Sequence, residues 1–454
     1  MAPLTASRIH IVLVPGFGGF DALGQLEYYA GVTPLFRAWQ GEAPGEPDEA
    51  NRRRAVLHYF DNLATAGVAT RAERLEAYLA KRFARGEFMP GDTLALVGHS
   101  TGGLDIRRAV LDLDAHRGEP IAVDGPHGAS FTVEPADLLR MVRRLVFLSV
   151  PQRGTNIADW VQAHRREREV LVADLRALVL AAQISFVDKA QAWVAARAAN
   201  VTDAHLLLAV QDALAEIDEK ALPAGQRRPA TIAAAQEASA ELSLWLRHIA
   251  SDFSAIDDLG SRPSPESTSP AHFTNEQREK ELRLWKDLGI ETRSYATIGA
   301  RPFAFAVGSP APRWELLKPS TYPNLTPQTD EARHMDFVYR ICYRACAGGP
   351  FESPAGAAAP TALRTRQNQA IEAWDNDGIV NTASMLWPDG ARTILVEGDH
   401  ADIIGHHRLV AKTPPSARKY HTYDLLRSAP KSESGSFANT FKQVWSDAFG
   451  FAVS

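Results

Sequence analysis

The motif Gly98-His99-Ser100-Thr101-Gly102 directly follows an apolar run at residues 93–97, and a helical pattern opens after it at Gly103 and Leu104. A tight turn between a strand and a helix forces its serine into a strained backbone conformation, and the flanking glycines remove Cβ atoms that would clash. The serine oxygen then projects from the carboxyl end of the sheet, near a helix N-terminus that favours developing negative charge. The motif therefore predicts a nucleophilic Ser100, with a plain turn as the alternative.

Four short apolar runs precede residue 151 and have the texture of buried strands. They are nearly continuous in apolar character, as expected when helices cover both faces of a parallel sheet, and they lie at residues 8–14, 55–60, 93–97 and 144–150. Between the second and third runs, apolar side chains recur at helical spacing. A strand, a helix and a strand in succession make a βαβ unit, so we expect an α/β fold with a mostly parallel central sheet flanked by helices.

The middle of the chain differs from its two ends. Between residues 156 and 288 it is rich in alanine and leucine, and Leu171, Leu175 and Leu178 recur at helical spacing, which predicts two or more amphipathic helices. A loop rich in proline and serine follows at residues 261–270.

Strand character returns at residues 293–299 and 393–397, and a closing helix is expected around residues 437–449. We therefore divide the chain into a first part of the α/β core, a helical lid or cap insertion, and a second part of the core, at residues 1–155, 156–290 and 291–454.

Composition excludes several classes of protein. Of 454 residues, 45% are apolar and 23% are charged, which is typical of a soluble globular protein. The net charge of −5 argues against a nucleic-acid partner held by counterion release. No run free of Asp, Glu, Lys and Arg exceeds 12 residues, so no transmembrane segment is expected. The first residues lack the apolar core of a signal peptide, so we expect a cytoplasmic location, with signal-less export left open. The two cysteines, Cys342 and Cys346, are expected to be free buried thiols.

A serine hydroxyl becomes a good nucleophile only when a base takes its proton, so a histidine and an orienting acid should follow Ser100 in the order acid, then histidine. His400 stands out among the 14 histidines because it lies just past the last expected strand. The loop Trp374-Asp-Asn-Asp-Gly-Ile-Val380 offers the acid as Asp375 or Asp377. Asp399 and Asp402 are expected to make local hydrogen bonds or face water, and His406 and His407 are expected to be solvated.

An oxyanion hole should complete the site. One donor is expected to be the backbone N–H of Thr101, the residue after the nucleophile. The other is expected from the loop Val14-Pro-Gly-Phe-Gly-Gly19, which follows the first strand, and we choose the N–H of Phe17. The alternatives for this loop are a plain glycine turn and a phosphate loop, although the Gly-Lys-Ser/Thr ending of a phosphate loop is absent.

Taken together, these motifs resemble a bacterial lipase or esterase of the α/β-hydrolase superfamily. The resemblance rests on Pro15-Gly-Phe-Gly-Gly19, Gly98-His-Ser-Thr-Gly-Gly103, Asn376-Asp-Gly-Ile-Val-Asn-Thr382 and Asp399-His-Ala-Asp402. It implies an α/β-hydrolase fold with Ser100 as nucleophile and His400 as base. Because the family carries its acid in an Asn-Asp-Gly-hydrophobic-Val loop, it also implies Asp377 rather than Asp375 as the acid.

The chain also departs from that family. Gln152, in Ser149-Val-Pro-Gln-Arg-Gly-Thr155, replaces a histidine of the family's Pro-His-x-Gly-Thr segment, and Pro15 replaces the histidine of its usual His-Gly oxyanion loop. Some relatives hold zinc through histidines near the nucleophile, but no histidine lies between Phe60 and Gly98, so we predict no zinc. Asp402 matches one ligand of a calcium site found in some relatives, without a convincing second one.

We therefore expect a serine esterase or lipase that needs no cofactor and no metal. Its expected partner is a small-molecule or lipid ester, and contact with a lipid interface is left open. Thioesterase, acyltransferase or amidase activity on the same triad is the alternative among enzymes. A non-catalytic binding protein on a hydrolase scaffold is the alternative outside them.

Overall fold

The fold is taken from a computed structural model. It describes most of the two ends of the chain and the segments that join them, at residues 7–19, 22–23, 26–41, 49–124, 130–163, 254–261, 267–300, 339, 342–348, 351, 361–362, 371–407, 426 and 436–454.

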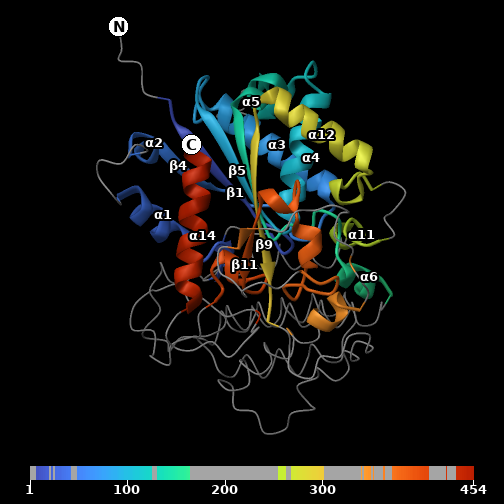
Figure 1. The fold of residues 1–454 in the computed structure, drawn as a ribbon. Helices are drawn as coiled ribbons and strands as arrows, with labels where there is room; N and C mark the ends of the chain where they lie inside the picture. The colour runs from blue at the N-terminus through green and yellow to red at the C-terminus, as the bar shows by residue number, and fades with distance from the viewer. Residues whose placement is uncertain are drawn as a thin grey trace, which may run out of the picture.

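A seven-stranded parallel sheet forms the centre of the molecule (Figure 1). Its strands, in spatial order, are β10 (Thr361–Ala362), β11 (Thr393–Glu397), β9 (Glu291–Ile298), β8 (Val142–Leu148), β5 (Thr93–His99), β1 (Ile9–Val14) and β4 (Ala55–Tyr59). All six neighbouring pairs are parallel. The predicted mostly parallel sheet is confirmed, as are the six strands expected from apolar runs.

The chain order changes direction at β1, the strand next to the edge strand β4 of this sheet. From β1 the chain first adds β4 on one side, and it then returns to add β5 on the other side of β1. At such a switch point the loops that leave two neighbouring strands run to opposite faces, and a crevice opens outside their carboxyl ends. The loop after β1 and the turn at Ser100 after β5 are therefore the two segments that flank this crevice.

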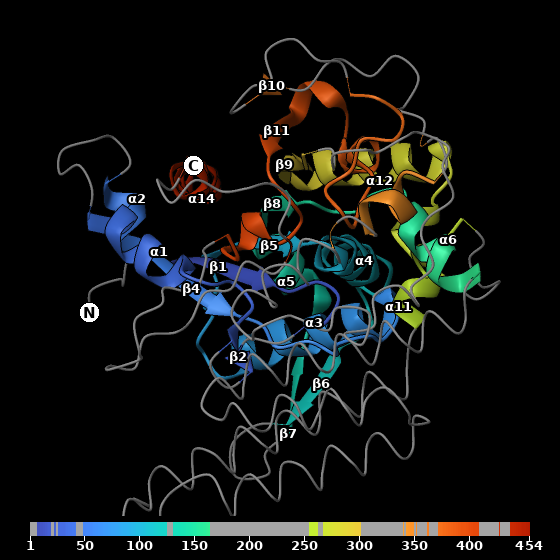
Figure 2. The same ribbon diagram turned by 90° about the horizontal axis from the view of Figure 1, so that it is seen from below.

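Helices cover both faces of the sheet. Figure 2 shows α1 (Val32–Gly41) and α14 (Ser436–Val453) on one side, and α3 (Val68–Ala84), α4 (Thr101–Ala115) and α12 (Asn275–Leu288) on the other. Side chains of β1 alternate between two apolar cores, with Ile11 and Leu13 in the core under α1 and α14 and Val12 and Val14 in the core under α3 and α4. Burial on both faces explains why the strands are nearly continuous apolar runs.

The remaining elements are short. They are α2 (Glu49–Arg54), α5 (Pro135–Met141), α6 (Asn156–Ala163) and α11 (Ser254–Asp257), the hairpins β2 (Ala22–Leu23) with β3 (Leu26–Glu27) and β6 (Ile121–Asp124) with β7 (Ser130–Val133), and the 3-10 turns η2 (Pro270–His272), η5 (Thr382–Met385), η6 (Gly390–Arg392) and η7 (Asp402–Ile404).

Helix α12 packs directly on the sheet. A capping box formed by Thr274 and Gln277 starts it, and Gly289 ends it in the left-handed conformation. Trp285 is buried in the core under α3 and α4, where its ring lies 6.2 Å from that of Phe147. The helix thus forms part of the layer that covers the sheet.

The predicted lid lies mainly outside the described residues. Residues 164–253, including the helical pattern at residues 171–182, are among those not described, so the division at residues 156 and 290 stays a prediction. None of the helices in the described part of the chain combines the length and the apolar character that a bilayer-spanning segment needs. The expectation of free, buried thiols at Cys342 and Cys346 is confirmed.

A fully buried ion pair fastens α12 to α4. Arg107 donates from Nε and Nη2 to the two carboxylate oxygens of Glu281, at 2.8 and 2.6 Å. The same guanidinium donates to Gln152 Oε1 at 2.8 Å and lies over the ring of Trp387, 4.0 Å from its centroid. Gln152, the departure from the family pattern, therefore helps to hold the arginine that joins the two helices.

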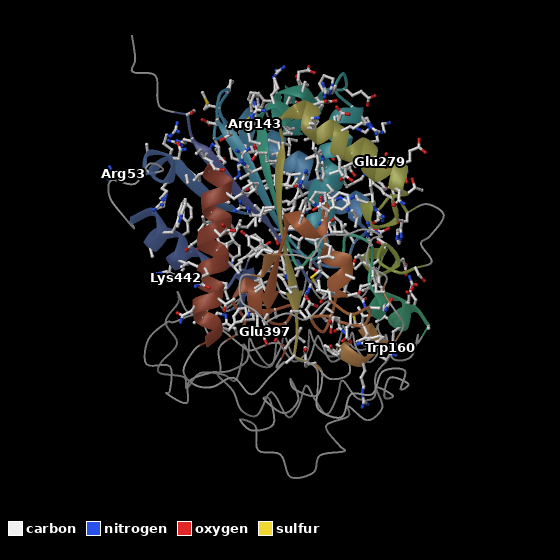
Figure 3. All side chains as sticks on the ribbon, viewed as in Figure 1. Arg53, Arg143, Trp160, Glu279, Glu397 and Lys442 are labelled. Atoms are coloured by element: carbon white, nitrogen blue, oxygen red, sulfur yellow. The ribbon has the colours of Figure 1, made fainter. Side chains whose placement is uncertain are left out.

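We expect Glu281→Ala to lower the free energy of unfolding by about 3–5 kcal/mol, because it leaves the buried Arg107 without its counter-charge. The matched control is Glu279→Ala on the exposed side of the same helix (Figure 3), where the lost pair with Arg283 should change the stability by less than about 1 kcal/mol. Urea unfolding followed by tryptophan fluorescence measures both. Equal destabilisation by the two substitutions would contradict the assignment of the buried pair.

Candidate active site

Ser100 occupies a strained turn at the carboxyl end of β5. Its backbone angles are φ 54° and ψ −133°, a conformation that residues with a side chain rarely adopt. The turn is held by the N–H of Ser100, which donates to the Leu148 carbonyl at 3.0 Å. The chain can turn this sharply because Gly98 has no Cβ. A Cβ at this position would lie 2.6 Å from the backbone of Gly103. The side-chain-free residue before His99 thus lets strand and helix meet.

The loop after β1 lies against this turn. A Cβ on Gly16 would come within 2.5 Å of the Cβ of Ser100, so only glycine allows the loop to approach the serine this closely. Phe17, the expected oxyanion donor, is the next residue in the loop. Thr101, the other expected donor, is the first residue of α4, where backbone N–H groups have no acceptor within the helix. Both predicted donors therefore lie in segments that border Ser100.

A buried arginine on α3 holds the loop after β1 in place. Arg71 of α3 donates through Nη2 to the carbonyls of Pro15 and Gly16, at 2.8 and 3.0 Å. Its Nε donates to the carboxylate of Asp105 on α4, at 3.0 and 3.2 Å. Burial raises the pKa of Asp105 to about 6, and the charge of Arg71 opposes that rise. The loop after β1 and the helix after Ser100 are thereby tied to one ion pair.

Asp377 and His400 are brought together at the ends of β9 and β11. His400 Nδ1 lies 2.8 Å from Asp377 Oδ2, and the backbone N–H of His400 donates to the carbonyl of Asp377 at 3.0 Å. The other carboxylate oxygen accepts from the backbone N–H groups of Ile379 and Val380, at 3.0 and 2.8 Å. The hydroxyl of Thr297, near the end of β9, donates to Oδ2 at 2.5 Å. Four hydrogen bonds thus orient the carboxylate.

Asp375 takes a different part in the same loop. Its carboxylate accepts from the backbone N–H of Glu372 at 2.8 Å, and its carbonyl accepts from the N–H of Thr382. The structure therefore places Asp377, and not Asp375, against His400.

Asp399 and Asp402 make the local hydrogen bonds expected of them, each accepting from backbone N–H groups of their own turn. The expectation that His406 and His407 are solvated is wrong, since both are buried. Their turn folds back against the core, where His406 Nε2 bonds to the Tyr28 carbonyl at 3.1 Å and the His407 ring packs on Phe437 and Phe441.

His99 joins the serine turn to the histidine loop. Its ring centroid lies 4.6 Å from that of His400, and its Nε2 is 3.0 Å from the His400 carbonyl. Ser100 directly follows His99 in the chain, so Ser100 and the imidazole of His400 lie in adjoining segments. Between these two described residues the structure contains no hydrogen bond from Ser100 Oγ to the His400 ring. Such contacts commonly form only once substrate is bound.

Several residues that build this site carry no signal in the sequence. Arg71, Asp105 and Thr297 are ordinary residues of regular elements, and only their long-range contacts give them a role. His99 stands inside the serine motif, which could have drawn attention to it. Among the described residues, no cluster of three or more His, Cys, Asp or Glu could hold a metal ion.

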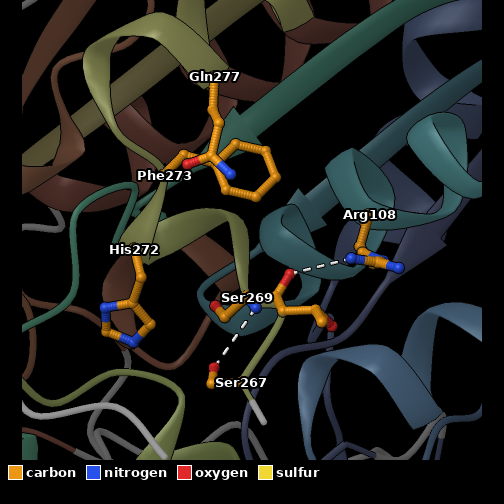
Figure 4. Close-up of a pocket in the computed structure, with 7 residues that line it drawn as sticks. Arg108, Ser267, Ser269, His272, Phe273 and Gln277 are labelled. Atoms are coloured by element: carbon orange, nitrogen blue, oxygen red, sulfur yellow. Dashed lines mark hydrogen bonds between the residues drawn. The ribbon is translucent and has the colours of Figure 1, made fainter. Parts of the chain in front are cut away.

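A small pocket lies elsewhere, between α4 and the start of α12 (Figure 4). Its volume is about 210 Å³, and it is lined by Arg108, Ser267, Thr268, Ser269, His272, Phe273 and Gln277. Its arginine is already paired with Asp112 at 2.7 Å and with the Thr268 carbonyl at 3.2 Å. None of the predicted site residues lines it.

We expect Gly98→Ala to destabilise the protein by about 1–3 kcal/mol or more, because the added methyl group must displace backbone atoms of Gly103. Gly118→Ala is the matched control, since a Cβ there meets nothing within 4 Å. Denaturant unfolding of the two variants beside the wild type measures the difference. A Gly98→Ala variant as stable as Gly118→Ala would show that the turn is not built on this close approach.

Comparison with known proteins gives distant structural likenesses. No protein-family model matches the chain, and no curated protein matches it. Among solved structures, a metagenomic carboxyl esterase is similar at 14% identity and a TM-score of 0.35, over 99% of this chain and 76% of that one. Lipase 1 from Pelosinus fermentans is similar at 15% identity and a TM-score of 0.36, over 88% and 94% of the two chains. EstA from Clostridium botulinum is similar at 13% identity and a TM-score of 0.34, over 89% and 85%. The fold of this chain is that of an α/β-hydrolase, which its own strand order and its strained serine turn make plain.

Proposed function

We propose that the protein is a serine hydrolase that cleaves carboxylic esters, with Ser100 as nucleophile, His400 as general base and Asp377 as the acid that orients it. The observation that carries the proposal is the 2.8 Å contact between His400 Nδ1 and Asp377 Oδ2, in the loops beside the turn of Ser100. An ionised carboxylate can only accept a hydrogen bond, so the proton of neutral His400 lies on Nδ1 and its Nε2 is left basic.

The proposed reaction has two halves. Ser100 Oγ attacks the ester carbonyl carbon while His400 Nε2 takes the hydroxyl proton. The tetrahedral intermediate collapses, the bond to the alcohol oxygen breaks, and His400 returns the proton to the leaving alcohol. Water then attacks the acyl-enzyme in the same way, which releases the carboxylic acid and restores Ser100. The cycle uses no cofactor.

The N–H groups of Phe17 and Thr101 are proposed to bind the negatively charged oxygen of both intermediates. Each such donor is worth about 3 kcal/mol of the barrier, so the loop after β1 must hold its position during turnover. Arg71 supports this role, because its bonds to two carbonyls of that loop leave it little freedom to shift.

Lipid-like or acyl esters are the proposed substrates. The middle segment leaves the core beside the acid loop, since Thr155, which precedes α6, donates to the Ile379 carbonyl at 2.7 Å. A helical cap that starts there would lie over the site and could bury an acyl chain. Thioesters, amides and acyl transfer remain alternatives, because the same groups support all of them.

We expect Ser100→Ala to abolish ester turnover and labelling by a fluorophosphonate probe while leaving the unfolding midpoint close to that of the wild type. The alanine keeps the turn but removes the only atom that can attack. Ser294→Ala, which removes a buried hydroxyl from β9, is the control and should keep both activities. Full turnover by Ser100→Ala would refute the assignment. Absence of labelling in the wild type would favour a binding protein.

We expect Asp377→Asn to lower kcat by about 10⁴-fold, because an amide at this position favours the wrong tautomer of His400. Asp375→Asn makes the same chemical change two residues earlier in the loop. It should keep most of the activity, since the carboxylate of Asp375 accepts from the backbone N–H of Glu372 and not from His400. Steady-state kinetics on p-nitrophenyl butyrate compares the two variants. A larger loss of kcat in Asp375→Asn than in Asp377→Asn would show that Asp375 is the acid that orients His400.

We expect kcat/KM to rise with acyl-chain length in a series of p-nitrophenyl esters from acetate to palmitate, because a longer chain buries more apolar surface. The same series as thioesters and amides tests the alternatives, and an emulsified triglyceride tests contact with a lipid interface. A preference for acetate over every longer ester would contradict the lipid-like substrate class.

A further inference from the structure

A single buried hydroxyl connects the three segments of the proposed site. The backbone N–H of Gly16 donates to the Tyr28 hydroxyl oxygen at 2.8 Å, and that oxygen lies 2.7 Å from His99 Nδ1. His99 Nε2 in turn lies 3.0 Å from the His400 carbonyl. One chain of hydrogen bonds thus runs from the loop after β1, through the serine turn, to the loop of the histidine.

The chemistry of the end groups fixes the direction of every bond. A carbonyl oxygen can only accept, so the proton of His99 is assigned to Nε2. In the neutral ring Nδ1 is then an acceptor, so the Tyr28 hydroxyl donates to it and uses a lone pair to accept from Gly16. Burial and the neighbouring His400 hold the pKa of His99 well below its ordinary value, in keeping with a neutral ring.

The chain of bonds is anchored at a second point. The Tyr28 carbonyl bonds to His406 Nε2 at 3.1 Å, so the turn that follows His400 contacts the backbone of the same tyrosine. The Tyr28 side chain is 6% exposed and packs edge-on against the His99 ring, with centroids 5.7 Å apart. Water therefore has little access to this position and cannot easily take over the hydrogen bonds of the Tyr28 hydroxyl.

We propose that Tyr28 and His99 are positioning residues, which hold the loop of Phe17, the turn of Ser100 and the loop of His400 at fixed mutual positions. Their effect on turnover rests on the proposed function, whereas the bonds themselves do not. Loss of the Tyr28 hydroxyl strands two buried polar groups, the Gly16 N–H and His99 Nδ1. The loop and the turn are then free to shift apart by the fraction of an ångström that matters for attack.

The kinetic test compares Tyr28→Phe with Tyr295→Phe. Both remove one buried tyrosine hydroxyl with a hydrogen-bond partner, but that of Tyr295 donates to Asp447 on α14 at 2.5 Å, away from the site. We expect Tyr28→Phe to lower kcat by about 10- to 100-fold with KM little changed. Tyr295→Phe should keep kcat near the wild-type value. Turnover is counted per serine labelled by fluorophosphonate, which removes any misfolded fraction from the comparison.

A second measurement reads the bonds without activity. In protein labelled with ¹⁵N-histidine, the ring shifts of His99, assigned by their loss in His99→Asn, should report the neutral Nε2–H tautomer in the wild type and in Tyr295→Phe. In Tyr28→Phe they should move towards a mixture of tautomers, because Nδ1 has lost its donor.

The outcomes separate the two proposals. Equal kcat in Tyr28→Phe and the wild type overturns the positioning role and leaves the proposed hydrolase standing. No turnover and no labelling in any variant overturns the proposed function, and the His99 tautomer then decides the chain of bonds alone. An Nδ1–H tautomer or a charged His99 ring in the wild type overturns the chain of bonds itself.

Discussion

The close approach of two backbone segments is the constraint on which the site depends. The loop after β1 and the turn after β5 leave neighbouring strands and run to opposite faces of the sheet, so their first residues face each other across the switch point. A Cβ on Gly16 would collide with the Cβ of Ser100, and a Cβ on Gly98 would collide with the backbone at the start of α4. Neither contact tolerates a side chain. The strained conformation of Ser100 is therefore a product of packing around it, because the strain of one residue is small beside the cost of separating a strand, a loop and a helix.

Helix α4 converts this local contact into a rigid arrangement. It carries Asp105 and Arg107, two residues apart, and each is paired with a buried opposite charge. Asp105 reaches α3 and the loop after β1 through Arg71, whereas Arg107 reaches α12 through Glu281. Buried ion pairs add little net stability compared with apolar packing, but removing one partner is costly. The two pairs therefore hold the helix in one position rather than supply the stability of the core, which comes from the apolar layers on both faces.

The sequence predicted the strands and the turn at Ser100 better than the contacts that hold them in place. The strands were predictable because burial on both faces makes each a continuous apolar run, and the turn at Ser100 because its glycines and its place after a strand are local features. The resemblance favoured Asp377 over Asp375, and the structure puts Asp377 beside His400. The prediction that His406 and His407 are solvated fails because local sequence does not reveal that their turn folds back onto Tyr28 and α14.

The sequence does not reveal the residues that contact the site over long range, for the same physical reason. Tyr28 lies between β3 and α1, Arg71 lies on α3 and Thr297 lies on β9. Each contacts the site through a polar side-chain group whose partner lies 12 or more residues away. A polar side chain that closes such a contact looks, in one sequence, like any other tyrosine, arginine or threonine. The two short hairpins and α5 were likewise not foreseen, because their runs are too brief for hydrophobic periodicity to distinguish them.

The way the middle segment joins the core has an evolutionary consequence. Asp159, next to the point where the chain leaves, accepts from the N–H of Ser261, next to the point where it returns, and Gln162 bonds to Asp257 at 3.2 Å. The segments that precede and follow residues 164–253 therefore lie side by side. Because the entropy of closing a loop grows only slowly with its length, a piece attached in this way can lengthen, shorten or be exchanged at little cost to the sheet beneath. Changes in this segment can therefore accumulate during evolution while the sheet and the turn of Ser100 keep their structure.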